Sequence, residues 1–63
     1  MDDVSETIAI ISDEQNREII KLVSKTELTI LQISNTLNIP LSTAYRKIRK
    51  LEELKIIKKT KVV

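Results

Sequence analysis

The 63-residue chain contains no cysteine, histidine or glycine, and Tyr45 is its only aromatic residue. Without cysteine and histidine the chain can form neither disulfide bonds nor the common zinc sites, so we expect no metal and no cofactor. Without glycine, any backbone position with a positive φ must be filled by asparagine or by another residue that carries a Cβ atom.

Other absences exclude whole classes of function. The sequence has no glycine-rich phosphate loop and no thiol or imidazole for catalysis, which argues against an enzyme. No apolar run is long enough to span a membrane, and the start of the chain lacks the basic region of a secretory signal. We therefore expect a cytoplasmic protein with no membrane partner.

The length predicts one small domain covering residues 1–63. A chain of this size buries only about 60% of its unfolded surface, so its core is thin. A homodimer would supplement that core by burying apolar side chains that the single chain leaves outside. The candidates for such a surface are Val4, Ile8, Ile11 and Val62.

The charged residues are unevenly distributed along the chain. Residues 1–31 hold seven acidic and three basic residues, whereas residues 32–63 hold two acidic and eight basic residues. A basic half opposite an acidic half is typical of a domain with one face for nucleic acid. A lysine-rich surface that only faces solvent is the simpler interpretation of the same charges.

The strongest periodic pattern lies in the basic half and predicts a helix over 41–54. Ala44, Ile48 and Leu51 recur at spacings of four and three, which places them on one helix face. At about 100° per residue, the opposite face and its flanks carry hydroxyls and then cations. These residues are Ser42, Thr43, Arg46, Arg49 and Lys50.

Two further helices are predicted upstream. Ser12 is expected to cap a helix over 13–24, with Gln15 at the reciprocal position of a capping box. Thr29 is expected to cap a helix over 30–37, with Gln32 three residues further on. Asn38 is the expected left-handed residue in the turn that follows. Together the helices predict a buried set of Ile19, Val23, Ile33, Leu37, Ile39, Ala44, Ile48 and Leu51.

The two ends of the chain are less regular in pattern. Residues 2–11 fit a short helix, which we favour, although their β-branched residues also suit a strand. Residues 56–62 are rich in β-branched residues and predict a strand. Lys58 and Lys59 form the charge run within it.

The run LTILQISNTLNIPLSTAYRKIRKLEELKII resembles the core of winged-helix regulators of archaea and bacteria, especially the ArsR-like and TrmB-like ones. The shared features are a hydroxylated residue before the second helix, Leu-Asn-Ile at the turn, Ser-Thr followed by Arg, and Leu-Glu-Glu before Ile-Ile. The resemblance covers about residues 10–57. It implies a mainly α fold, namely a tri-helical helix-turn-helix of winged-helix type with a short or incomplete C-terminal wing strand.

The resemblance implies a transcriptional regulator that binds double-stranded DNA in a sequence-specific manner, with the helix over 41–54 in the major groove. Arginine can bind guanine O6 and N7 with two hydrogen bonds, while phosphate contacts fix the register. The contacts to bases or nearby phosphates are assigned to Ser42, Thr43, Tyr45, Arg46 and Arg49. The remaining candidate DNA-binding residues are Lys50, Thr29 with its neighbour Ile30, Lys58 and Lys59.

Each assignment has a structural alternative. Ser42 and Thr43 can satisfy free amides of the first helical turn, and the ring of Tyr45 can pack on the preceding helix. Arg49 and Lys50 can pair with Glu53.

The sequence also departs from the family. Metal sensing is not carried over, because the metal-sensing members use cysteine or histidine. The returning wing strand and the dimerising helix are missing, so the chain is either a fragment of a longer regulator or a very small protein. The alternative function is a winged helix that binds another protein. It predicts an exposed apolar or acidic docking patch, for which Ile30, Leu31 and the N-terminal isoleucines would be support if they are exposed.

Overall fold

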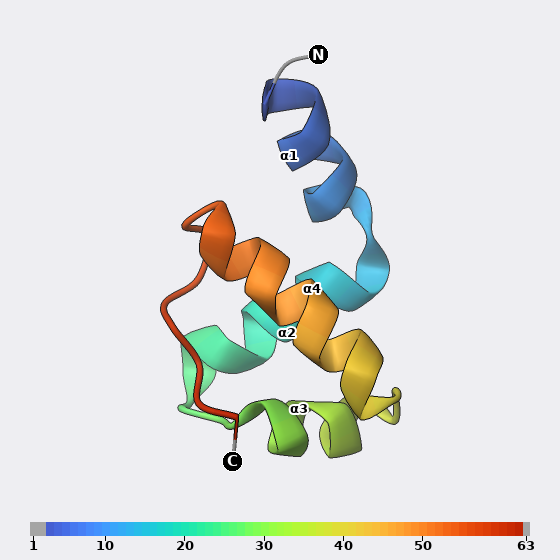
Figure 1. Cartoon of the computed structure of the whole chain (residues 1–63), viewed down its shortest axis with the longest axis vertical. Coiled ribbons are helices and arrows are strands. Elements are labelled where there is room, and N and C mark those ends of the chain that lie inside the picture. Colours follow the sequence, from blue (N-terminus) through green and yellow to red (C-terminus); the bar gives the residue numbers. More distant parts are fainter. Residues whose placement is uncertain (1–2, 63) are drawn as a thin grey trace.

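The computed structural model describes residues 3–62, and it describes side chains from Ser5 onward. Within this range the chain forms four helices: α1 (Asp3–Ser12), α2 (Glu14–Lys25), α3 (Ile30–Leu37) and α4 (Leu41–Glu53). The helices α2, α3 and α4 pack together, and α1 projects from them at one end of the molecule (Figure 1). The side chain of Val4, which the sequence assigned to a dimer surface, lies outside the described residues.

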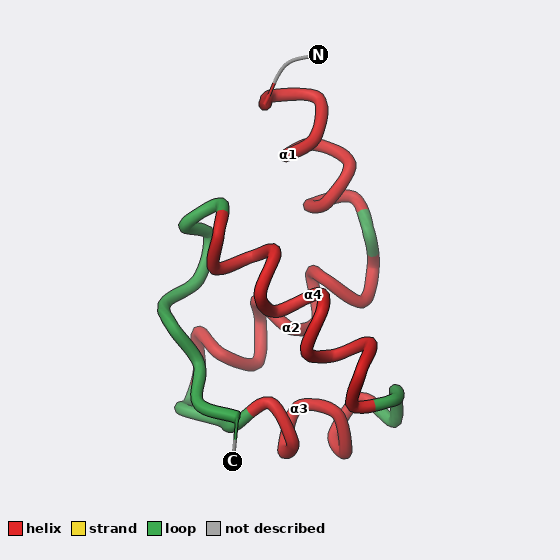
Figure 2. The backbone as a smooth tube through the Cα atoms, in the orientation of Figure 1, coloured by secondary structure: helices red, strands yellow, loops and turns green. Residues whose placement is uncertain are grey.

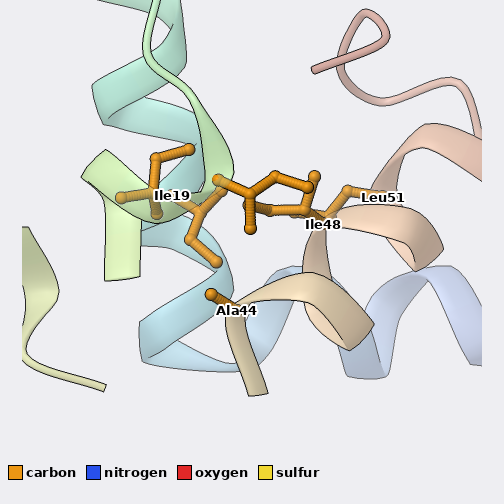
Figure 3. Packing of buried hydrophobic residues seen from close by; sticks show 6 residues of the cluster. Ile19, Ala44, Ile48 and Leu51 are labelled. Atoms are coloured by element: carbon orange, nitrogen blue, oxygen red, sulfur yellow. The ribbon is translucent and has the colours of Figure 1, made fainter. Parts of the chain in front are cut away.

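The core joins α2, α3 and α4 through side chains from each of them. Figure 3 shows Ile19 of α2 facing Ala44, Ile48 and Leu51 of α4, all fully buried. The predicted apolar stripe of α4 is therefore confirmed. Val23, Leu37 and Ile39, which were also predicted to be buried, pack against this cluster and are only partly buried, and Ile33 is fully buried.

The expected exposure of Ile30 is wrong. Ile30 is fully buried in the core, whereas Leu31 remains exposed. Successive residues of a helix lie about 100° apart, so one of two adjacent apolar residues can face the core while the next faces solvent. The burial of Ile30 removes part of the case for an apolar protein-docking patch.

The start of α2 differs from the prediction by one residue. Ser12 ends α1, and Asp13 is the residue that caps α2: its carboxylate accepts a hydrogen bond from the backbone N–H of Asn16 at 3.1 Å. A carboxylate there also interacts favourably with the positive end of the helix dipole. Asn16 is itself buried, and its side-chain amide donates to the carbonyl of Ile10, which fixes the end of α1 against α2.

The turn between α3 and α4 has the expected geometry. Asn38 takes a left-handed conformation with φ of 57°. The backbone N–H of Ile39 donates to the carbonyl of Ser34 at 3.0 Å, and the Ser34 hydroxyl donates back to the Ile39 carbonyl at 2.6 Å. Ser34 is buried, so its small side chain allows the turn to close against α3. Pro40 then precedes the first residue of α4, where its missing N–H removes no helical bond.

The end of α4 forms a second left-handed turn, which the sequence did not signal. Lys55 has φ of 61°; its N–H donates to the Glu52 carbonyl, and the N–H of Ile56 donates to the Leu51 carbonyl. This pair of bonds is a Schellman motif, in which glycine is the usual left-handed residue. The turn reverses the chain, so the residues that follow run back toward the start of α3 (Figure 1).

The predicted strand over 56–62 is wrong, because no residue in the range 3–62 forms a strand (Figure 2). A strand requires a neighbouring strand for its backbone bonds. Here the carbonyls of Lys61 and Val62 accept instead from the N–H groups of Ile30 and Leu31 at 2.8 and 3.2 Å. We call residues 56–62 the C-terminal segment.

Candidate nucleic-acid interface

The outward face of α4 is centred on Arg46. This residue lies two positions from both Ala44 and Ile48, which turns it away from the core. Arg46 and the nearby Ser42 are exposed, while Thr43 is half-buried on the flank. Among the side chains of residues 5–62 the guanidinium of Arg46 has no hydrogen-bond or ion-pair partner. Its five donors are therefore available to a ligand.

Arg49, one turn further along α4, is held by its neighbours. Its guanidinium lies 4.7 Å from the centre of the Tyr45 ring and 3.4 Å from the Tyr45 hydroxyl, and it bonds to Glu52 at 2.6 Å. The hydrogen bond with Tyr45 and the one with Glu52 raise the pKa of Arg49. Because arginine is charged at any physiological pH, the result is a fixed orientation, set most firmly by the short bond to Glu52. The expectation that Arg49 could pair with Glu53 is wrong, because Arg49 pairs with Glu52.

The Tyr45 ring is exposed on α4. It forms a cation–π contact with the Arg49 guanidinium. The ring therefore supports the Arg49 guanidinium from the same helix.

The Lys50 ammonium forms ion pairs with two carboxylates. Its ammonium lies 2.7 Å from Glu6 of α1 and 3.6 Å from Glu53, and the hydrogen bond with Glu6 is the main cause that raises the pKa of Lys50. Glu53 was expected, but the contact with Glu6, 44 positions away in the sequence, was not. The neighbouring Lys47 pairs with Asp13 at 3.2 Å, so Glu6 of α1 and Asp13, the cap of α2, hold one flank of α4.

These contacts place α1 beside the outward face of α4. A groove of about 650 Å³ separates the two helices. Its walls include Glu6, Ile10, Tyr45, Arg46, Arg49 and Lys50. Arg46 and the ion pair between Lys50 and Glu6 therefore line the same groove.

Thr29 caps α3 as predicted. Its hydroxyl accepts from the N–H of Gln32 at 3.1 Å, and the Gln32 side chain accepts from the N–H of Thr29 at 2.8 Å. The next two amides, of Ile30 and Leu31, bond to the C-terminal segment. The start of α3 therefore has its free amides satisfied within the chain, and Thr29 keeps only its hydroxyl hydrogen for an outside acceptor. Ile30 is buried and offers no side chain to a phosphate.

Lys58 and Lys59 are exposed on the C-terminal segment, and so is Lys61, which the sequence reasoning did not select. Thr60, which lies between Lys59 and Lys61, is buried. Its backbone N–H donates to the second carboxylate oxygen of Glu52 at 2.5 Å. The lysines thus extend from a segment that is fixed to α4 through Glu52 and to α3 through its carbonyls. The spacing of Arg49 and Glu52 could have indicated their ion pair, but the bond to Thr60 has no signal in the sequence.

No helix between residues 3 and 62 is long and apolar enough to cross a membrane. In the same part of the chain, no three His, Cys, Asp or Glu side chains are grouped so that they could hold a metal ion.

Comparison with protein families gives one match. A family model described as a helix-turn-helix domain matches residues 11–60, which covers α2, α3, α4 and most of the C-terminal segment. No curated protein and no solved structure matches the chain. Helix-turn-helix domains bind DNA through the second helix of the motif, which is the helix after the turn. The family is a DNA-binding and non-enzymatic one.

Proposed function

Because the chain belongs to the helix-turn-helix domain family, we propose that it is a transcriptional regulator that binds double-stranded DNA in a sequence-specific manner. In this proposal α4 enters the major groove with its outward face toward the bases. The helix is then the recognition helix, and α3 is the helix that crosses the DNA backbone.

The observation that carries the proposal is the state of Arg46. An exposed guanidinium with no hydrogen-bond or ion-pair partner among the side chains of residues 5–62 lies at the centre of the α4 face that points away from the core. An unpaired arginine has no internal ion pair to break before it binds a ligand. It also has the fork of donors that matches guanine O6 and N7, so we assign base readout to Arg46.

The other candidate residues divide by their surroundings. Exposed Ser42 lies one turn before Arg46 and is placed to donate to a base edge or a nearby phosphate. Thr43 and Arg49 flank Arg46, and the Tyr45 ring supports the Arg49 guanidinium. The phosphate contacts are assigned to Thr29, Lys50, Lys58 and Lys59. Lys50 exchanges its carboxylate partners for phosphate when DNA binds.

We propose further that the domain is of winged-helix type and similar to the ArsR-like and TrmB-like regulators. In this interpretation the C-terminal segment takes the place of the wing and carries the lysines to the DNA beside α4. Its anchoring to α3 and α4 through backbone bonds supports this position.

The proposal includes a homodimer formed through α1. Ile8 and Ile11 are exposed by 59% and 44%, on a helix that projects from the core. Two copies that bury these side chains would present two recognition helices to half-sites about one helical turn apart. Sedimentation equilibrium tests this part: wild type should dimerise, and Ile8→Glu should be monomeric. A wild-type chain that stays monomeric at high concentration refutes it.

The DNA proposal is tested with the purified chain. Binding to a fluorescent random duplex is measured by anisotropy over a series of salt concentrations, and preferred duplexes are selected from a random library. The expected result is binding that weakens steeply with salt, together with an enriched sequence motif. Absence of both on every duplex overturns the proposal and leaves protein interaction as the function of the domain.

A further inference from the structure

The carboxylate of Glu52 connects two parts of the candidate interface. One oxygen accepts from the Arg49 guanidinium at 2.6 Å, and the other accepts from the backbone N–H of Thr60 at 2.5 Å. The side chain of Glu52 is only 13% exposed. Both oxygens are therefore committed to bonds inside the protein, one on α4 and the other on the C-terminal segment.

The bond to Thr60 lies in the middle of three lysines. Lys58, Lys59 and Lys61 are exposed on either side of it, while Thr60 is buried. Beyond Thr60, the carbonyls of Lys61 and Val62 bond to the first amides of α3. The lysines are therefore held between two anchors, and the anchor on the α4 side is Glu52.

An acidic side chain at this position needs an explanation. A carboxylate near a surface that binds phosphates lowers the attraction for DNA. The neighbouring Glu53 is the expected type of residue for a surface, with a side chain 70% exposed and one long contact to Lys50 at 3.6 Å. Glu52 differs because it is nearly buried and has two short bonds.

We propose that Glu52 is a positioning residue for DNA binding, which fixes the lysines of the C-terminal segment and the Arg49 guanidinium in one rigid surface. The inference rests on the proposed function. It assigns to Glu52 no contact with DNA. By fixing the segment before DNA binds, Glu52 reduces the conformational entropy that the three lysines lose on binding.

The proposal predicts that replacing two adjacent acidic residues, Glu52 and Glu53, changes duplex affinity in different directions. Glu53→Gln removes one negative charge and should leave duplex affinity unchanged or raise it slightly. Glu52→Ala removes the same charge and should weaken duplex binding, by about twofold to 150-fold in Kd, the range typical of coupling between contacting residues. Glu52→Gln keeps an oxygen that can accept from Thr60 but loses the ion pair, so its Kd should be intermediate.

A salt series separates positioning from general loss of structure. In the wild-type background, replacing Lys58 and Lys59 together by alanine should reduce the salt slope by about two counterions. In the Glu52→Ala background the same replacement should reduce the slope by less, because the lysines are no longer held near the phosphates. Thermal unfolding followed by circular dichroism selects a temperature at which all variants are folded.

A measurement without DNA tests the anchoring directly. Heteronuclear NOE values of the amides from Lys58 to Lys61 should fall in Glu52→Ala and remain at wild-type values in Glu53→Gln. Unchanged NOE values, or a Glu52→Ala chain that binds duplex as tightly as Glu53→Gln does, overturn the positioning role. If wild type binds no duplex, the proposed function fails, and the role of Glu52 in DNA binding fails with it. A fall in the NOE values would then support the anchoring alone.

Discussion

Replacement of Arg46 by alanine tests the central assignment of the interface. The side chain is exposed and has no hydrogen-bond or ion-pair partner among the side chains of residues 5–62, so its removal breaks no such bond there. A surface change of this kind alters the free energy of unfolding by no more than about 0.5 kcal/mol. Any large loss of DNA affinity in Arg46→Ala therefore reports a lost contact with DNA.

The size of the loss follows from the chemistry of the contact. A guanidinium that bonds to guanine through two donors contributes about 1–3 kcal/mol of discrimination between bases. Since 1.4 kcal/mol corresponds to tenfold, Kd on the selected duplex should rise by about 5-fold to 150-fold. On random duplex the loss should be small, because there Arg46 has only its charge to contribute.

The assay is fluorescence anisotropy on a selected and a random duplex across a series of salt concentrations. Arg17→Ala is the matched control, since it removes the same exposed side chain from α2 and changes the net charge equally. Lys50→Ala should weaken binding to both duplexes alike and lower the salt slope by roughly one counterion. If Arg46→Ala loses the same affinity on both duplexes, Arg46 is a phosphate contact and the base readout belongs to Ser42, Thr43 or Arg49.

Three further predictions concern the stability of the fold, each measured by urea unfolding followed by circular dichroism. Ile48→Ala empties a fully buried position and should cost about 2–5 kcal/mol, a large part of the roughly 3–9 kcal/mol expected for 63 residues, whereas Leu41→Ala at an exposed position should cost little; equal losses would contradict the core. Lys55→Gly should stabilise the fold by about 1 kcal/mol because φ is 61° there, while Lys21→Gly inside α2 should destabilise it by about the same amount; a loss at Lys55 would refute the left-handed turn. The Asn16 N–H and then the Lys47 ammonium hold the pKa of Asp13 below its usual 3.8, so the stabilisation by this carboxylate is present above about pH 4 and is lost as the pH falls through the lowered pKa. Asp13→Asn, which keeps a capping oxygen, should therefore be less stable than wild type at pH 7 and equally stable at pH 2, and a difference that persists at pH 2 would exclude the charge as its cause.

Several features of this protein follow from local sequence alone. The spacing of Ala44, Ile48 and Leu51 determines which face of α4 is buried, because a helix repeats every 3.6 residues whatever it packs against. Thr29 and Gln32 form their capping box, and Asn38 its left-handed turn, through bonds between near neighbours. Together these features predicted the helix-turn-helix and the outward position of Arg46.

Contacts between distant residues decided the rest. The tendency of residues 56–62 to form a strand depends on a partner strand, and in the folded chain their carbonyls bond to the first amides of α3 instead. The pairing of Lys50 with Glu6 and the bond from Thr60 to Glu52 depend on how α1 and the C-terminal segment pack beside α4. Residue spacing cannot encode such distances, because they are set only when the core closes and brings separate segments together. The sequence thus determined which residues form the candidate DNA-binding face, and the tertiary structure decided which of those residues are free to bind and which are already held.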